Sequence, residues 1–145
     1  MVILLSYATL HLLLASVLPS PWWVPDVTMA GLVLAIAQRP KRWLVVSVTA
    51  GLLTILWAIR FPIQVFCGMV LLGLAAQLVA TQWDLADVRV QCWLVGGATL
   101  LMSLWVFWLD DALSVRILGW MMIRAALTAF TIPLLQVRRA LNPEP

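Results

Sequence analysis

One arginine stands well inside the last apolar stretch of the chain, where a charged head group in lipid is costly. Arg124 lies about two helical turns into the stretch 117–136. At helical spacing it shares a face with three further residues, Trp120, Thr128 and Thr131. The candidate counter-charges lie at predicted helix ends on one side of the membrane, the outer side: Asp26, Asp110 and Asp111. We expect Arg124 to pair with Asp26 or Asp111; the alternatives are extension to the lipid head groups and contact with a ligand or partner.

The other residues capable of chemistry are few. His11 is the one histidine and lies near the middle of the first apolar stretch. It is either a proton relay or a partner in an interhelical hydrogen bond, and the lack of nearby acids favours the hydrogen bond. The motifs HExxH, GxSxG and GxxxxGK[ST] are absent, and Cys67 and Cys92 fit no metal-binding spacing. We therefore expect no catalytic residue, cofactor or metal site, and no enzyme.

Small or short side chains recur at helical spacing in the third apolar stretch: Ser47, Gly51, Thr54 and Ala58. Such a ridge lets helix backbones approach closely in a membrane, where packing drives helix association. It either packs inside the protein or forms a groove for a transmembrane helix of another protein. We take it as the candidate partner-binding surface.

The composition places these residues in a membrane protein. Of the 145 residues, 64% are hydrophobic and only 10% are charged, whereas a soluble domain has about 25% charged residues. Most of the surface must therefore face lipid instead of water. The length corresponds to a single domain, residues 1–145.

Six apolar stretches follow one another, at residues 2–18, 24–38, 43–59, 62–82, 92–109 and 117–136. A transmembrane helix needs about 20 residues, with about 17 as the lower limit, and most of the stretches reach this length. The second does so only with its flanking residues. The alternating pattern of a β-barrel is absent. Because the connections are short, we expect a compact all-α bundle of six antiparallel transmembrane helices.

The basic residues give this bundle an orientation. The loop after the second stretch holds Arg39, Lys41 and Arg42, whereas the loop before it holds no Lys or Arg. Cytoplasmic loops are enriched in Lys and Arg, so the basic loop and both termini are predicted to be cytoplasmic. With this orientation the remaining basic loop and tail residues divide into Arg89, Arg138 and Arg139 inside, and Arg60 and Arg116 outside. The nine tryptophans lie near predicted helix ends, as interface anchors do.

Several segments keep a recognisable order. The first stretch is followed by "WWVPDVTMAGLVLAIAQRP", with a Pro-Asp start and a basic turn, and then by "AGLLTILWAIRFPIQVFCGMVLLGLAAQL". The chain ends in a proline-bearing stretch with a basic tail, "FTIPLLQVRRALNP". Over nearly its whole length the chain thus resembles the rod shape-determining protein MreD family. It departs from the family in having Thr54 where an acid often follows "GLL", and "AIRFPIQ" in place of a glycine-rich turn.

The resemblance implies a six-helix bundle in the bacterial cytoplasmic membrane, similar to the substrate-binding components of energy-coupling-factor vitamin transporters. It implies a non-enzymatic scaffold that binds an MreC-type single-span partner and connects the MreB filament with the cell-wall synthases. The residues alone also favour contacts with membrane proteins, because no sizeable soluble part is predicted. No nucleic-acid partner is expected. The alternatives are the substrate-binding component of such a transporter, or a small accessory subunit of another membrane complex.

Overall fold

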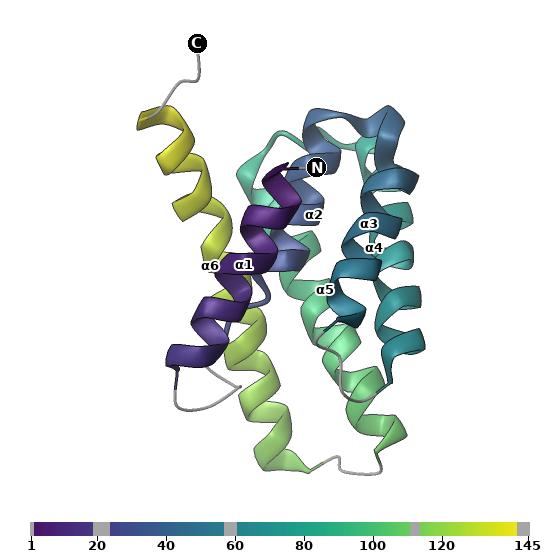
Figure 1. Cartoon of the computed structure of the whole chain (residues 1–145), viewed down its shortest axis with the longest axis vertical. Helices are drawn as coiled ribbons and strands as arrows, with labels where there is room; N and C mark the ends of the chain where they lie inside the picture. The colour runs from purple at the N-terminus through teal and green to yellow at the C-terminus, as the bar shows by residue number, and fades with distance from the viewer. Residues whose placement is uncertain (1, 19–23, 57–60, 111–113, 142–145) are drawn as a thin grey trace.

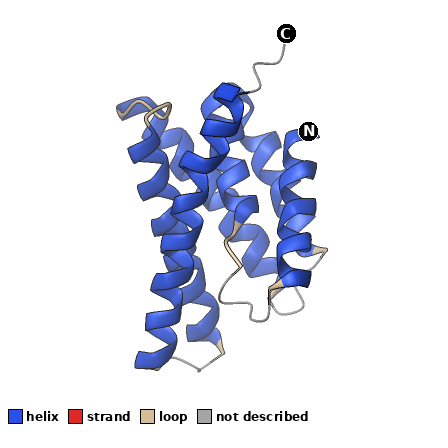
Figure 2. Cartoon of the chain, turned by 90° about the vertical axis from the view of Figure 1, so that its left-hand side faces the viewer, coloured by secondary structure: helices blue, strands red, loops and turns tan. Residues whose placement is uncertain are grey.

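The computed structural model describes residues 2–18, 24–56, 61–110 and 114–141, with side chains between residues 4 and 136 of these ranges. Within them the chain is all helical, with six α-helices, one 3₁₀-helix and no strand (Figure 2). The helices are α1 (Val2–Val17), α2 (Val27–Gln38), η2 (Pro40–Arg42), α3 (Trp43–Ile55), α4 (Pro62–Gln82), α5 (Val88–Leu109) and α6 (Val115–Leu141). The expectation of an all-α fold is confirmed for the described residues.

The helix ends follow from local chemistry. The Asp26 carboxylate caps α2 by accepting a hydrogen bond from the Met29 N–H at 3.2 Å. Asp87 caps α5 in the same way, accepting from the Arg89 N–H at 2.8 Å. Pro62 stands in the first turn of α4, where a missing N–H costs little. As a result α2 begins three residues later than the expected stretch 24–38, and α5 begins at residue 88 instead of 92.

The short helix α2 lies at the centre, and the other α-helices surround it (Figure 1). Nine of its twelve residues are buried, and Leu32, Val33 and Ile36 have no exposed surface. This matches its sequence, because a helix that is apolar on every side is buried on every side. Around it α3 packs closely with α4, and α5 with α6, while α1 lies mainly against α2. The fold is therefore two tight helix pairs and one single helix around a central helix.

Three helices are long and apolar enough to cross a membrane: Pro62–Gln82, Val88–Leu109 and Val115–Gln136. The helices α1 and α2 are apolar but shorter, with 16 and 12 residues. The outer faces carry large apolar side chains, and Leu13, Leu101 and Phe130 are each more than 60% exposed. Apolar surface on this scale is not stable in water, so the structure indicates a membrane protein.

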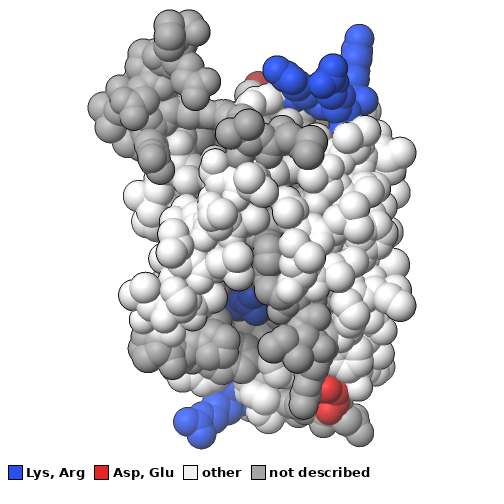
Figure 3. Space-filling view, in the orientation of Figure 1, with Lys and Arg blue, Asp and Glu red and all other residues white. Residues whose placement is uncertain are grey.

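Most charged side chains of the described residues lie at the ends of the bundle (Figure 3). One end, called here the basic end, holds Arg39, Lys41 and Arg42 between α2 and α3, and Arg89 at the start of α5. The helix α1 begins and α6 ends at this same end (Figure 1). The other end, called here the opposite end, holds Asp110 and Arg116 beside the α5–α6 connection.

Candidate functional site

A cavity of about 210 Å³ lies among the helices in the half of the bundle toward the opposite end. It follows from the shortness of α2, whose 12 residues span about 18 Å. The neighbouring α5 and α6 have 22 and 27 residues, or about 33 Å and 40 Å. The central helix therefore fills only part of the bundle, and Asp26 at its start lines the space that remains.

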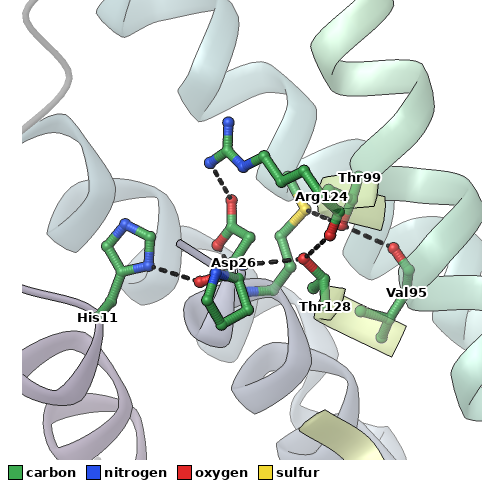
Figure 4. A network of polar contacts seen from close by, with 8 residues as sticks. His11, Asp26, Val95, Thr99, Arg124 and Thr128 are labelled. Carbon is green, nitrogen blue, oxygen red and sulfur yellow. Dashed lines mark hydrogen bonds and ion pairs between the residues drawn. The ribbon is translucent and has the colours of Figure 1, made fainter. Parts of the chain in front are cut away.

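An ion pair joins Arg124 of α6 to Asp26 in this cavity (Figure 4). The Nη2–Oδ2 distance is 3.8 Å, and the side chains are 26% and 16% exposed. Of the two expected counter-charges the structure thus pairs Asp26, while Asp111 lies outside the described residues. A distance of 3.8 Å is too long for a hydrogen bond. The Arg124 Nε is buried and has no hydrogen-bond partner among the described residues.

Thr128 sets the position of Asp26 along α6. Its hydroxyl oxygen accepts a hydrogen bond from the Asp26 N–H at 2.9 Å and donates one to the Arg124 carbonyl at 2.8 Å (Figure 4). The Thr128 side chain has no exposed surface. The predicted polar face of α6 therefore turns into the bundle at Thr128, and one side chain ties α2 and α6 together.

His11 of α1 borders the same cavity and is only 9% exposed. Its Nδ1 lies 3.2 Å from the carbonyl oxygen of Pro25, the residue before Asp26 (Figure 4). A ring with its proton on Nδ1 donates this bond. The geometry thus corresponds to the hydrogen-bonding alternative, and the bond holds α1 against the segment that leads into α2.

The sequence interpretation missed the polar side chains that α5 adds to this region. Thr99 and Ser103 line the cavity and are 2% and 8% exposed. The Thr99 hydroxyl donates to the Val95 carbonyl at 2.9 Å and lies 3.6 Å from the Met29 sulfur (Figure 4). The signal was present, because polar residues four apart in an apolar stretch share one helix face.

The small-residue ridge on α3 does not face a partner, contrary to our expectation. Ser47 and Thr54 are 0% and 4% exposed, and Gly51 is buried. On the facing helix α4, a Cβ added to Gly73 would overlap the Ser47 side chain. The ridge allows close packing of α3 against α4, so the partner-binding hypothesis is wrong for Ser47, Gly51 and Thr54. Ala58 lies outside the described residues.

An apolar groove of about 390 Å³ lies instead between α4 and α5. It is lined by small residues on both helices, Gly68 and Ala75 on α4 and Gly97 and Ala98 on α5. Met29 of the central helix also lines it. At Gly68 the Met102 side chain of α5 fills the space beside α4, because an added Cβ would lie 2.6 Å from the Met102 Cε.

Farther along the groove the two helices leave room between them. A Cβ added to Gly97 would meet no heavy atom within 4 Å. Trp93 and Trp105, which are 84% and 39% exposed, line the groove twelve residues apart on α5. At about 1.5 Å per residue this separation is about 18 Å. The groove is therefore a long apolar furrow open to the surroundings of the bundle.

A second polar contact joins α5 to α6 near the basic end. The Gln136 side-chain amide donates to the Gln91 carbonyl oxygen at 2.8 Å, and the Gln91 amide donates to the Leu85 backbone carbonyl at 2.7 Å. Gln91 is 2% exposed. The amides border a cavity of about 290 Å³. Sequence reasoning did not single out either glutamine, although an amide in an apolar stretch needs a partner.

The fold and these sites define a class: an all-helical membrane protein with a polar cavity inside and an apolar groove outside. Within the described part of the chain, no three His, Cys, Asp or Glu residues come together as they would around a metal ion. No family model, no curated protein and no solved structure matches the chain.

Proposed function

We propose that the protein is a scaffold of the bacterial rod-elongation complex, a single membrane domain that holds an MreC-type partner by its transmembrane helix. In this proposal the chain crosses the cytoplasmic membrane six times, and the basic end and both termini face the cytoplasm. The order of segments that resembles the MreD family supports the role, and the distribution of Lys and Arg supports the orientation. Through its partner the scaffold connects the MreB filament with the cell-wall synthases, without chemistry of its own.

The groove between α4 and α5 is the observation that carries the proposal. A membrane-spanning partner gains nothing from hydrophobicity alone, because lipid is equally apolar; it gains from close packing against small residues. The groove offers Gly97 and Ala98 on one wall and Ala75 on the other. Its length of about 18 Å covers more than half of a hydrocarbon core of about 30 Å. A single helix is the partner that fits this shape.

The size of the polar cavity favours the scaffold over the vitamin-binding transporter component. Pockets for drug-sized ligands measure about 300–1,000 Å³, whereas this cavity measures about 210 Å³. An accessory subunit of another membrane complex would use the same groove, so the identity of the bound partner separates these two roles.

Site-specific photo-crosslinking tests the scaffold. A photoreactive residue at Leu101, beside the groove, is compared with one at Leu52 on α3; both side chains are more than half exposed. We expect Leu101 alone to capture a single-span protein with an extracytoplasmic domain. Gly97→Leu should abolish this capture, because it fills the groove. Gly119→Leu is the matched control, since a Cβ at either glycine meets no heavy atom.

The outcomes separate the proposals. Equal capture from Leu52 and Leu101, or unchanged capture in Gly97→Leu, means that the groove is not the binding surface. Capture of a stoichiometric ATPase identifies a transporter component and refutes the scaffold. Capture of a membrane protein unrelated to cell-wall elongation identifies the accessory-subunit role instead.

Cysteine labelling tests the orientation. Single cysteines replace Gln82 at the basic end and Ser114 at the opposite end, in a chain carrying Cys67→Ser and Cys92→Ala. We expect a membrane-impermeant maleimide to label Ser114→Cys in intact cells, and Gln82→Cys only after permeabilisation. The reverse pattern would place the basic end outside.

A further inference from the structure

Within the described part of the chain, the guanidinium of Arg124 is incompletely hydrogen-bonded. It carries five N–H donors, and its counter-charge among the described residues, the Asp26 Oδ2, is 3.8 Å away. The other Asp26 oxygen accepts from the Met29 N–H. Among the described residues the buried Arg124 Nε has no partner. Unmade hydrogen bonds at a buried charge are costly, so a group that enters the cavity and accepts two parallel bonds would stabilise the site.

The charges around the cavity select the kind of group. Among the described lining residues, Arg124 and Asp26 bring one positive and one negative charge, and the His11 ring contacts the Pro25 carbonyl. A dianion such as phosphate would place two further negative charges beside Asp26 in a region of low dielectric. A carboxylate adds one, and its two oxygens match the planar fork of an arginine. The arrangement therefore favours a monoanionic carboxylate.

The remaining walls select the body of the ligand. Three methionines from three helices line the cavity, Met29, Met69 and Met102, together with Val106 and Phe107. Methionine side chains are apolar and adapt to varied shapes. The volume of about 210 Å³ limits the ligand to a small molecule. These walls suit a compact apolar group attached to the carboxylate.

The site can be reached from outside the bundle. Figure 3 shows a Lys or Arg side chain at the bottom of a hollow, on a flank whose described residues are otherwise uncharged. Arg124 is the basic residue that lines the cavity, and its side chain is 26% exposed. A small molecule can therefore approach the guanidinium without unfolding the bundle.

We propose that this cavity binds a small carboxylate with an apolar body, its carboxylate on Arg124 and its body against the methionines. The proposal goes beyond the scaffold role and is independent of it, because the scaffold role rests on the groove between α4 and α5.

Ligand-dependent thermal unfolding of the purified full chain in mild detergent tests the site. The probes are acetate, butyrate and benzoate, each compared with its alcohol (ethanol, butanol and benzyl alcohol), and inorganic phosphate as the dianion. We expect a saturable rise in unfolding temperature with the carboxylates, strongest for butyrate or benzoate, and none with the alcohols or phosphate. Binding to the folded state alone produces such a rise.

Variants assign the effect to the cavity. Arg124→Gln should weaken the apparent affinity at least about tenfold, whereas Arg116→Gln, an exposed arginine on the same helix, should leave it unchanged. If Arg124→Gln does not fold, the paired change Asp26→Asn with Arg124→Gln removes both charges. Ser103→Leu adds volume to the cavity wall, leaves both charged residues in the chain, and should also abolish the response.

The proposal is overturned by any of three results. The first is that no carboxylate gives a saturable rise; the second is that the alcohols or phosphate act as strongly. The third is that the response persists in both the Arg124 variant and Ser103→Leu. None of these results bears on partner capture at the groove, so the two proposals fail separately.

Discussion

Replacing Gly73 with alanine should destabilise the bundle, although alanine is the better helix former. The added Cβ would overlap the Ser47 Oγ and lie 2.7 Å from the Ser47 Cβ, about 0.7 Å short of an ordinary contact of 3.4 Å. Rotation of Ser47 moves the oxygen but leaves the Cβ in place, and it breaks the 2.6 Å hydrogen bond from the hydroxyl to the Trp43 carbonyl. The α3–α4 pair must therefore separate.

The magnitude follows from two opposing terms. Overpacking of a tight interface costs about 1–3 kcal/mol, and the change from glycine to alanine inside a helix returns about 0.5–1 kcal/mol. We expect Gly73→Ala to lower the free energy of unfolding by up to about 2.5 kcal/mol, with about 1 kcal/mol in the middle of the range. Gly97→Ala is the matched control. Its Cβ meets no heavy atom, so this variant should be unchanged or more stable by up to about 1 kcal/mol.

Unfolding by titration with sodium dodecyl sulfate, followed by tryptophan fluorescence, measures both variants. A double variant sharpens the test. Ser47→Gly with Gly73→Ala places the glycine on α3 and the larger residue on α4. It should recover most of the lost stability, because the new methyl group occupies the space of the serine. If Gly73→Ala is as stable as Gly97→Ala, or if Ser47→Gly gives no recovery, the close contact between α3 and α4 is refuted.

The same titration checks three further predictions. Arg124→Gln should cost about 1–3 kcal/mol, because the partly exposed ion pair lies between surface pairs and fully buried pairs in strength. Asp26→Asn in the same chain should restore part of this loss. An unchanged stability in Arg124→Gln would mean that the ion pair is not formed. Gln91→Leu should cost about 1–3 kcal/mol, because it leaves the Gln136 amide without its acceptor. Adding Gln136→Leu should recover stability. A double variant less stable than Gln91→Leu would argue against the contact between the two amides. Thr128→Val should cost about 1–3 kcal/mol by removing the acceptor of the Asp26 N–H. An unchanged stability would argue against this hydrogen bond between α6 and the start of α2.

The sequence predicted the helical, membrane-embedded character because so few charges cannot cover a soluble domain. It also predicted the polar centre in outline. A charge inside an apolar helix requires a partner, and Asp26 after Pro25 stood where a helix cap and a counter-charge coincide. The structure joins Arg124 to Asp26. What the sequence left open was the choice among three aspartates, since that choice depends on how far α2 extends along α6.

The sequence did not predict which side of each helix faces the interior of the bundle. In a soluble protein the change from apolar to polar residues marks the inward side of a helix. In this chain both sides are apolar: Leu72 of α4 is 5% exposed, whereas Leu71 beside it is 56% exposed. A ridge of small residues then indicates close packing without saying against what. This is why the ridge on α3 was assigned to a partner, and why the groove between α4 and α5 was missed.

The enclosure of α2 also sets the order in which the protein can be assembled. At about 18 Å this helix is shorter than the hydrocarbon core of about 30 Å, and it begins at a charged residue, so it is a poor candidate for independent insertion. Its partner Arg124 and its anchor Thr128 are on α6, which leaves the ribosome about a hundred residues after Asp26. The α2 segment can therefore complete its polar contacts only after the last helix has been made. A chain that stalls before α6 leaves Asp26 without Arg124 and Thr128.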